Sequence, residues 1–197
     1  MIRAERPLDD LPFHLLTHTT FSTLKLSRMF IETTSIHALA AALPSLPHLR
    51  ILDLSSNGLD GLSLALFSSV LASPQCRLER LNLSSNVITG SSVGPFCAAL
   101  QNNVSLSTLN LSDNFLGTQS CLLLIQAILR NSSQLKMLHI DSNQVRVTME
   151  ELYALLLREK PGTVFKQVSM RKNPIDECDN DKYITLFKEM FNIGFAF

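Results

Sequence analysis

One pattern recurs through most of this chain, and its period limits the possible folds more than any other feature. The segments that carry it most clearly are "LRILDLSSNGL" (49–59), "LERLNLSSNVI" (78–88), "LSTLNLSDNFL" (106–116) and "LKMLHIDSNQV" (135–145). All four fit L-x-x-L-x-L-x-x-N-x-L with aliphatic exchange, and their first leucines lie 29, 28 and 29 residues apart. A fixed period of this length is typical of repeat proteins, in which each unit buries its apolar face only by stacking on its neighbours.

Two further segments extend the series. "FKQVSMRKNPI" (165–175) keeps the pattern, whereas "FSTLKLSRMFI" (21–31) has Met29 where asparagine is expected. We therefore predict six units over 21–178, with the outer two degenerate, as terminal capping repeats tend to be. The units begin near 21, 49, 78, 106, 135 and 165. We interpret 1–20 as an N-terminal segment that forms a partial cap, and 179–197 as a C-terminal capping helix with an aromatic tail.

The pattern resembles the leucine-rich repeat, in its long, ribonuclease-inhibitor-like form. The segments after the asparagine support this subtype, because Gly61, Gly90 and Gly117 are each followed by an apolar helical pattern. The resemblance implies an α/β fold, a right-handed β-α solenoid that forms a horseshoe arc. A parallel sheet would line its concave face, and helices would cover its convex face.

Each unit predicts one strand and one helix. Alternate residues of a strand face opposite ways, so the leucines of L-x-L point into the core and the residues between them point out. We expect strands near 23–27, 51–55, 80–84, 108–112, 137–141 and 167–171. We expect helices near 35–43, 62–72, 94–102, 119–130, 149–159 and 180–191.

The asparagine at the ninth position of a unit is expected to turn inward. A buried amide must find hydrogen-bond partners, and the backbone groups freed where the strand bends can supply them. The sequence therefore predicts a structural ladder of Asn57, Asn86, Asn114, Asn143 and Asn173.

Partners commonly bind the concave face in the family that the chain resembles. The candidate binding residues there are Lys25, Asp53, Arg80, Asn82, Asn110, Met137, His139, Asp141, Arg171 and Lys172. The exposed columns hold no aromatic residue, although binding hot spots are usually Trp, Tyr or Arg. We therefore expect a partner to contact a rim, a terminus or the helical face as well.

A group of basic residues in the last two units allows two interpretations. It comprises Lys136, Arg146, Lys166, Arg171 and Lys172. It is either a solvated face offset by nearby acids or a corner that receives an acidic protein segment.

Both ends of the solenoid raise questions of their own. In the tail, Phe191, Ile193, Phe195 and Phe197 alternate with small or polar residues at period two, which indicates a strand. Either this tail folds back over the last repeat, or Phe195 and Phe197 anchor into a partner or pair with a sheet edge. The N-terminal end is poorly capped, and an uncovered solenoid end invites association with another subunit.

Several functions are not expected. The net charge is zero, which argues against nucleic-acid binding, and no segment approaches the roughly 18–20 apolar residues of a membrane helix. His14 and His18 have no third ligand nearby, and "DECDND" (176–181) lacks the glycine and final glutamate of a calcium loop, so no metal or other cofactor is expected. Nucleotide-binding motifs and a poised nucleophile are missing as well, so we do not expect an enzyme.

The sequence favours a cytoplasmic protein. The first residues lack the apolar core of a secretory signal, and the four cysteines show no pairing pattern. The formal glycan acceptors that begin at Asn82 and Asn110 are interpreted as by-products of a repeat rich in Asn and Ser.

The predicted function is a non-enzymatic protein-interaction module, a scaffold or assembly subunit in a cytoskeletal, ciliary or signalling complex. The alternative is a regulator of a small GTPase or other nucleotide-hydrolysing partner, like the Ran GTPase-activating protein, which has the same repeat type.

Overall fold

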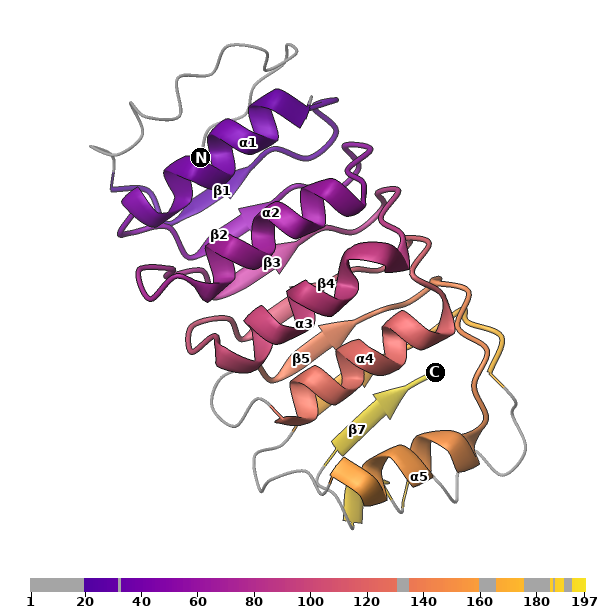
Figure 1. Cartoon of the computed structure of the whole chain (residues 1–197). Coiled ribbons are helices and arrows are strands. Elements are labelled where there is room, and N and C mark those ends of the chain that lie inside the picture. Colours follow the sequence, from indigo (N-terminus) through magenta and orange to yellow (C-terminus); the bar gives the residue numbers. More distant parts are fainter. Residues whose placement is uncertain are drawn as a thin grey trace.

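The computed structural model is a single layer of strands covered on one side by helices (Figure 1). It describes residues 20–31, 33–130, 135–159, 166–175, 185, 187–189 and 193–197. The strands are β1 (Thr23–Lys25), β2 (Ile51–Asp53), β3 (Arg80–Asn82), β4 (Thr108–Asn110), β5 (Met137–His139), β6 (Lys166–Ser169) and β7 (Ile193–Ala196). The helices are α1 (Thr33–Ala42), α2 (Gly61–Ala72), α3 (Val93–Asn102), α4 (Gly117–Arg130) and α5 (Met149–Glu159), with short 3-10 turns η2 (Leu43–Ser45) and η3 (Gly90–Ser92).

All strands of the sheet run parallel, in the order in which they occur in the chain. The register repeats from unit to unit, so that Ile51 pairs with Arg80 and Arg80 pairs with Thr108. Each residue therefore lies beside the residue at the same position of the next repeat. The fold is the β-α solenoid that the periodicity predicts, and every position of the repeat forms a row across the sheet.

The core lies between the sheet and the helices. The leucines of each unit point into it, and Leu52, Leu54 and Leu81 are almost completely buried. The helices contribute their apolar side chains from the other side, with Phe67 and Phe96 fully buried. Burying a side chain of this size contributes about 1.5–3 kcal/mol to folding, so stacking of repeats is the main source of stability.

The strands are shorter than the pattern predicts, and the reason is local. We expected strands of about five residues, but β2 to β5 each end at the fifth position of their unit. Hydrogen bonds to the next repeat continue past that point, because Leu54 N–H donates to Asn82 O and Ser56 N–H donates to Ser84 O. The residue between them bonds to a side chain instead, which interrupts the regular ladder.

The C-terminal tail adds a seventh strand to the sheet. β7 pairs in parallel with β6, in a register that joins Val168 to Phe195. The helix expected near 180–191 falls largely outside the described residues. Within that range the structure describes Thr185 and 187–189, and these residues are helical. The chain therefore crosses back once more before β7 and lays its last strand on the edge of β6.

Candidate protein-interaction surface

The asparagines at the ninth position join neighbouring repeats. Asn86 is buried, and its side-chain Nδ2 donates to Leu54 O of the preceding repeat at 3.2 Å and to Leu83 O of its own repeat at 2.9 Å. Its Oδ1 accepts from the backbone N–H groups of Asn57 and Leu59, at 2.9 and 3.0 Å. Asn57, Asn114, Asn143 and Asn173 make equivalent bonds to carbonyl groups of two repeats. These bonds satisfy backbone groups that the turn after each strand removes from the ladder.

The residue before each of these positions has an unusual backbone conformation. All six residues at the eighth position have a positive φ, between 52° and 59°: Arg28, Ser56, Ser85, Asp113, Ser142 and Lys172. None is β-branched or aromatic, the side chains that tolerate this left-handed region least. That restriction is the signal by which the sequence alone could have indicated the turn. The left-handed residue reverses the chain locally, and the ninth residue then points inward.

The fifth-position row has a structural task that sequence analysis did not assign. Asp53, Asn82 and Asn110 were candidate partner-binding residues, yet each accepts a hydrogen bond from the backbone N–H two residues further on, at 3.0–3.1 Å. These N–H groups, of Ser55, Ser84 and Ser112, are the ones that leave the ladder at the strand ends. The side-chain oxygens of Asp53, Asn82 and Asn110 therefore cap the ends of β2, β3 and β4.

Asp141, another candidate, links three repeats. Its Oδ1 accepts from Ser169 Oγ at 2.6 Å and from Arg171 N–H at 2.7 Å, both in the following repeat. On the other side, Ser112 Oγ lies 3.2 Å from Asp141 Oδ2 and accepts from Asp141 N–H at 3.2 Å. Both carboxylate oxygens are therefore used within the sheet.

The third-position row is different, because its side chains make no hydrogen bond or ion pair with any described residue. It comprises Thr23, Ile51, Arg80, Thr108, Met137 and Gln167, in register across β1 to β6. Arg80 is exposed and Met137 is half-buried, as is His139 two residues further on. Lys25, Arg171 and Lys172 are exposed at the two ends of the sheet. The candidates that remain open to a partner are thus Arg80, Met137, His139 and these end residues.

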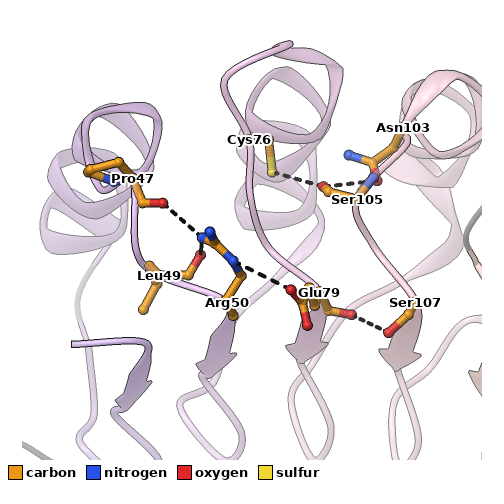
Figure 2. A network of polar contacts seen from close by, with 8 residues as sticks. All are labelled: Pro47, Leu49, Arg50, Cys76, Glu79, Asn103, Ser105 and Ser107. Atoms are coloured by element: carbon orange, nitrogen blue, oxygen red, sulfur yellow. Dashed lines mark hydrogen bonds and ion pairs between the residues drawn. The ribbon is translucent and has the colours of Figure 1, made fainter. Parts of the chain in front are cut away.

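A polar network lies at the beginning of the strands. Figure 2 shows Arg50 between the carbonyl groups of Pro47 and Leu49 and the carboxylate of Glu79. Arg50 Nε lies 3.4 Å from Glu79 Oε1, and both side chains are partly exposed. Glu79 O in turn accepts from Ser107 Oγ at 2.9 Å. The network joins three successive repeats and lies beside Arg80.

The basic group does not form one corner. Lys166 is buried, and its Nζ donates to Leu135 O at 2.6 Å. Burial, together with the nearby charge of Lys136, lowers the pKa of Lys166. Lys136 and Lys166 lie where their strands begin, whereas Arg171 and Lys172 lie beyond the end of β6. Of the two interpretations of this group, a single basic corner of all five residues does not fit, because the length of the strand separates its members.

The aromatic tail packs on its own chain. Phe195 is 8% exposed, and its ring centroid lies 5.1 Å from that of Phe187 and 5.7 Å from that of Phe197. Phe197 is half-buried. This placement matches the interpretation in which the tail folds back over the last repeat, and β7 provides the pairing with a sheet edge. Anchoring of these rings in a partner stays a prediction.

Sequence analysis missed a row at the tenth position, where the chain leaves the sheet toward the helices. We call it the exit rim; it comprises Phe30, Gly58, Val87, Phe115, Gln144 and Pro174. Phe30 is 82%, Val87 46% and Phe115 52% exposed, which is unusual for aromatic and aliphatic side chains. The repeat pattern leaves this position unspecified, so only the alignment of the six units could have drawn attention to it.

On the convex side, α4 and α5 border a hollow of about 520 Å³ whose lining includes Leu122, Leu123 and Leu155. An ion pair joins the two helices, with Arg130 Nε 2.6 Å from Glu159 Oε2 and Arg130 Nη2 3.0 Å from Glu159 Oε1. The Arg130 guanidinium lowers the pKa of Glu159, whose side chain is only 5% exposed.

The cysteines, the possible metal ligands and the helix lengths bear on which activities the described residues could support. Cys76, Cys97 and Cys121 are free and buried, and burial raises the pKa of both Cys97 and Cys121 to about 12. Within the described ranges, the side chains of His, Cys, Asp and Glu form no group of three that could hold a metal ion. The described helices also include none that is both long and apolar enough to span a membrane. His14, His18 and 176–181 lie outside the described residues.

Comparisons with known proteins agree with this architecture. Residues 45–67 and 77–99 match two families, described as Leucine Rich repeat and Leucine Rich Repeat. The Ribonuclease inhibitor of Sus scrofa is 31% identical over 150 residues, which cover 76% of this chain and 33% of the inhibitor. NACHT, LRR and PYD domains-containing protein 12 of Homo sapiens is 32% identical over 117 residues, covering 59% of this chain and 11% of that protein. Among solved structures, the Leiomodin-1 Actin-Binding Site 2 (ABS2) matches with a TM-score of 0.61 at 18% identity, over 76% of this chain and 87% of that chain.

The chain is a leucine-rich repeat protein. Its repeats are of the ribonuclease-inhibitor-like type, as their length and the relationship to the two ribonuclease inhibitors show. The chain spans about a third of the length of those inhibitors. The likeness to leiomodin-1 supports the fold alone.

Proposed function

We propose that this protein is a non-enzymatic interaction module, a scaffold or assembly subunit of a cytoplasmic complex, and that its concave face binds a protein partner. The observation that carries this proposal is the difference between two rows of the sheet. In the fifth-position row, Asp53, Asn82 and Asn110 cap their own strands, whereas the third-position row makes no side-chain hydrogen bond with the described part of the chain. Arg80 is exposed and the other side chains of the third-position row are half-buried. Because they lie on a rigid sheet and have no polar partner among the described residues, they are available for recognition.

The partner surface that we propose centres on Arg80 and Met137. Arg80 is exposed on β3, beside the network of Arg50 and Glu79, and Met137 lies two strands further along the same row. Arginine is a frequent hot spot, and methionine adapts its shape to varied apolar partners. Parallel strands are spaced about 4.8 Å apart, so these side chains present a narrow stripe, and a partner also needs contacts beyond the sheet.

The experiment starts with capture of partners by the tagged protein, followed by direct binding measurements with each purified candidate. Arg80→Ala and Met137→Ala should each weaken binding without changing the melting temperature. A matched control is Arg77→Ala, which removes an exposed arginine outside the strands. Binding that survives the combined Arg80→Ala and Met137→Ala change would overturn the concave-face proposal.

The alternative as a regulator of a GTPase predicts a different readout. A recovered nucleotide-hydrolysing partner should then hydrolyse faster when the protein is added, and Arg80→Ala should abolish the acceleration if the same face is used. Binding without any change of hydrolysis supports the scaffold.

A further inference from the structure

The exit rim leads from an apolar patch to a basic pocket one repeat further along. Val87 N–H donates to Leu59 O and Phe115 N–H donates to Ile88 O, so Val87 and Phe115 are neighbours in successive repeats. An isolated parallel bridge between Thr89 and Phe115 fixes the same contact. The two apolar side chains are about half exposed. Phe30, two repeats before Val87, is a third exposed apolar side chain of the exit rim.

The pocket follows at the next two repeats. Its volume is about 410 Å³, and it is lined by Ser142, Gln144, Arg146, Lys172 and Pro174. The backbone around it is firmly placed, because Arg146 N–H donates to Thr118 Oγ1 at 2.9 Å and Ser142 N–H donates to Arg171 O at 2.9 Å. Ser142, Gln144 and Lys172 all have positive φ, which sets the direction in which each Cα–Cβ bond leaves the backbone.

Among the described residues, no counter-charge contacts the cations of the pocket. Neither Arg146 nor Lys172 makes a salt bridge with a described residue. Asp141 uses both carboxylate oxygens inside the sheet, and the exposed Asp113, one repeat earlier on the eighth-position row, forms no ion pair with a described residue. The lining therefore offers a guanidinium, an ammonium, a hydroxyl and an amide, all of which can donate hydrogen bonds to a carboxylate.

We propose that the exit rim binds an extended acidic segment of a protein partner. An apolar side chain of that segment packs against Val87 and Phe115, and carboxylates that follow it enter the basic pocket. Repeats are about 5 Å apart along the rim, and an extended chain rises about 3.3 Å per residue. The acidic side chains therefore lie about two to four residues after the apolar one.

The charges also select against other ligands. Two cations on a chain of zero net charge are too few to hold a nucleic-acid backbone, which needs a broad basic surface. A carboxylate-rich peptide is neutralised by the same two groups and gains apolar contact from the rim, so both parts of the surface are used.

The test uses a synthetic probe, acetyl-Ser-Leu-Ser-Glu-Glu-Glu-Ser-amide, titrated into the isotope-labelled full chain and followed by amide chemical shifts. At low salt, shifts should appear at Phe115, Gln144, Arg146 and Lys172 and should saturate. Replacing the three glutamates of the probe by lysines, or its leucine by serine, should remove or weaken these shifts. The absence of saturable shifts at the rim with millimolar probe would overturn the proposal.

Variants test the two halves of the surface separately. Combined Arg146→Glu and Lys172→Glu should lower the affinity for the probe by about tenfold or more. The same change should make binding depend less on salt concentration. Phe115→Ser should lower the affinity for the probe but leave the salt dependence of probe binding unchanged. The matched control is combined Arg77→Glu and Lys188→Glu, which reverses two exposed cations that do not line the pocket. An equal loss in this control would show a net-charge effect and would contradict the inference.

This inference rests on the proposed function, since it supplies a second contact for a protein partner. The two proposals fail differently. If Arg80→Ala abolishes binding of a purified partner while the rim variants change neither partner nor probe binding, the rim inference fails and the concave-face proposal stands. If the probe binds at the rim and the Arg80→Ala and Met137→Ala changes leave partner binding unaltered, the concave-face proposal fails and the rim inference stands.

Discussion

The side-chain amide of Asn82 donates a 3.1 Å hydrogen bond to Oδ1 of Asp53, its counterpart one repeat earlier. The same Asp53 oxygen accepts from Ser55 N–H and from Ser55 Oγ, at 3.0 and 2.7 Å. Asn82 Oδ1 caps Ser84 N–H in turn. A residue that looked like a glycan acceptor or a partner contact is thus part of the internal bonding of the sheet.

A loss of stability is expected when a rung of the ninth-position ladder is removed. Asn86→Ala leaves the backbone N–H groups of Asn57 and Leu59 without a partner. Unsatisfied buried groups cost about 1–3 kcal/mol each before relaxation. We expect the free energy of unfolding to fall by about 3 kcal/mol or more, measured by urea denaturation. Asn102→Ala is the control, because that exposed amide makes one helix bond at 3.2 Å; equal losses in the two variants would contradict the ladder.

The fifth-position and third-position rows should respond differently to truncation. Asn82→Ala removes the cap of Ser84 N–H and the bond to Asp53, so it should lower the free energy of unfolding by about 1 kcal/mol. Arg80→Ala should change it by less than about 0.5 kcal/mol, as is usual for exposed sites. Thermal unfolding of both variants checks the assignment, and a larger effect at Arg80 would reverse it.

Two glycines in successive turns of the same segment provide a packing test. A Cβ added at Gly90 would lie 2.1 Å from Ser120 Oγ and 2.8 Å from Leu116 O, whereas one at Gly94 would meet nothing within 4 Å. Gly90→Ala should therefore destabilise the fold by about 1–3 kcal/mol. Gly94→Ala should stabilise it by about 0.5 kcal/mol, since alanine loses less backbone freedom in a helix. Equal melting temperatures for the two variants would show that the contact between η3 and α4 is looser than described.

Acid should weaken the fold through two carboxylates. The backbone N–H of Ser63, which bonds to Asp60 at the start of α2, lowers the pKa of Asp60, and the Arg130 side chain lowers the pKa of Glu159. Because each folded-state pKa lies below the unfolded value, the stabilisation is complete above the ordinary values of 3.8 and 4.5 and is lost as pH falls through the folded values.

Urea denaturation from neutral pH to about pH 3 measures this loss. Asp60→Asn keeps a good N-cap but removes one titrating group, so its stability should fall less steeply with acid. If the stability of this variant depends on pH in the same way as that of the unchanged chain, Asp60 does not contribute to the loss of stability in acid.

The last strand should be needed for stability. Phe195→Ala removes a buried ring that packs on Phe187, and such truncations cost about 3 kcal/mol. Deletion of 192–197 should lower the melting temperature further, because it also exposes the edge of β6. If either change leaves the melting temperature intact and abolishes binding to a purified partner, the tail is an anchor and the capping interpretation is wrong.

Much of the fold followed from the repeat. The leucine spacing predicted which strand residues enter the core, and Leu52, Leu81 and Leu138 are all buried. The inward asparagines and the helices after each glycine followed from the same pattern, since both depend on residues within one repeat. The solenoid and its family were therefore predictable from the sequence.

The sequence by itself determined the period, the face of each side chain and the stacking of units, because these depend on alternation and spacing along the chain. Only the tertiary structure decided that Asp141 bridges Ser112 and Ser169, that Lys166 is buried, and that the tail forms a parallel strand. The physical reason is that these features depend on a neighbour about 30 residues away or on the absence of a following repeat. A polar side chain on a repeated face looks the same in the sequence whether its partner is the next repeat or another protein.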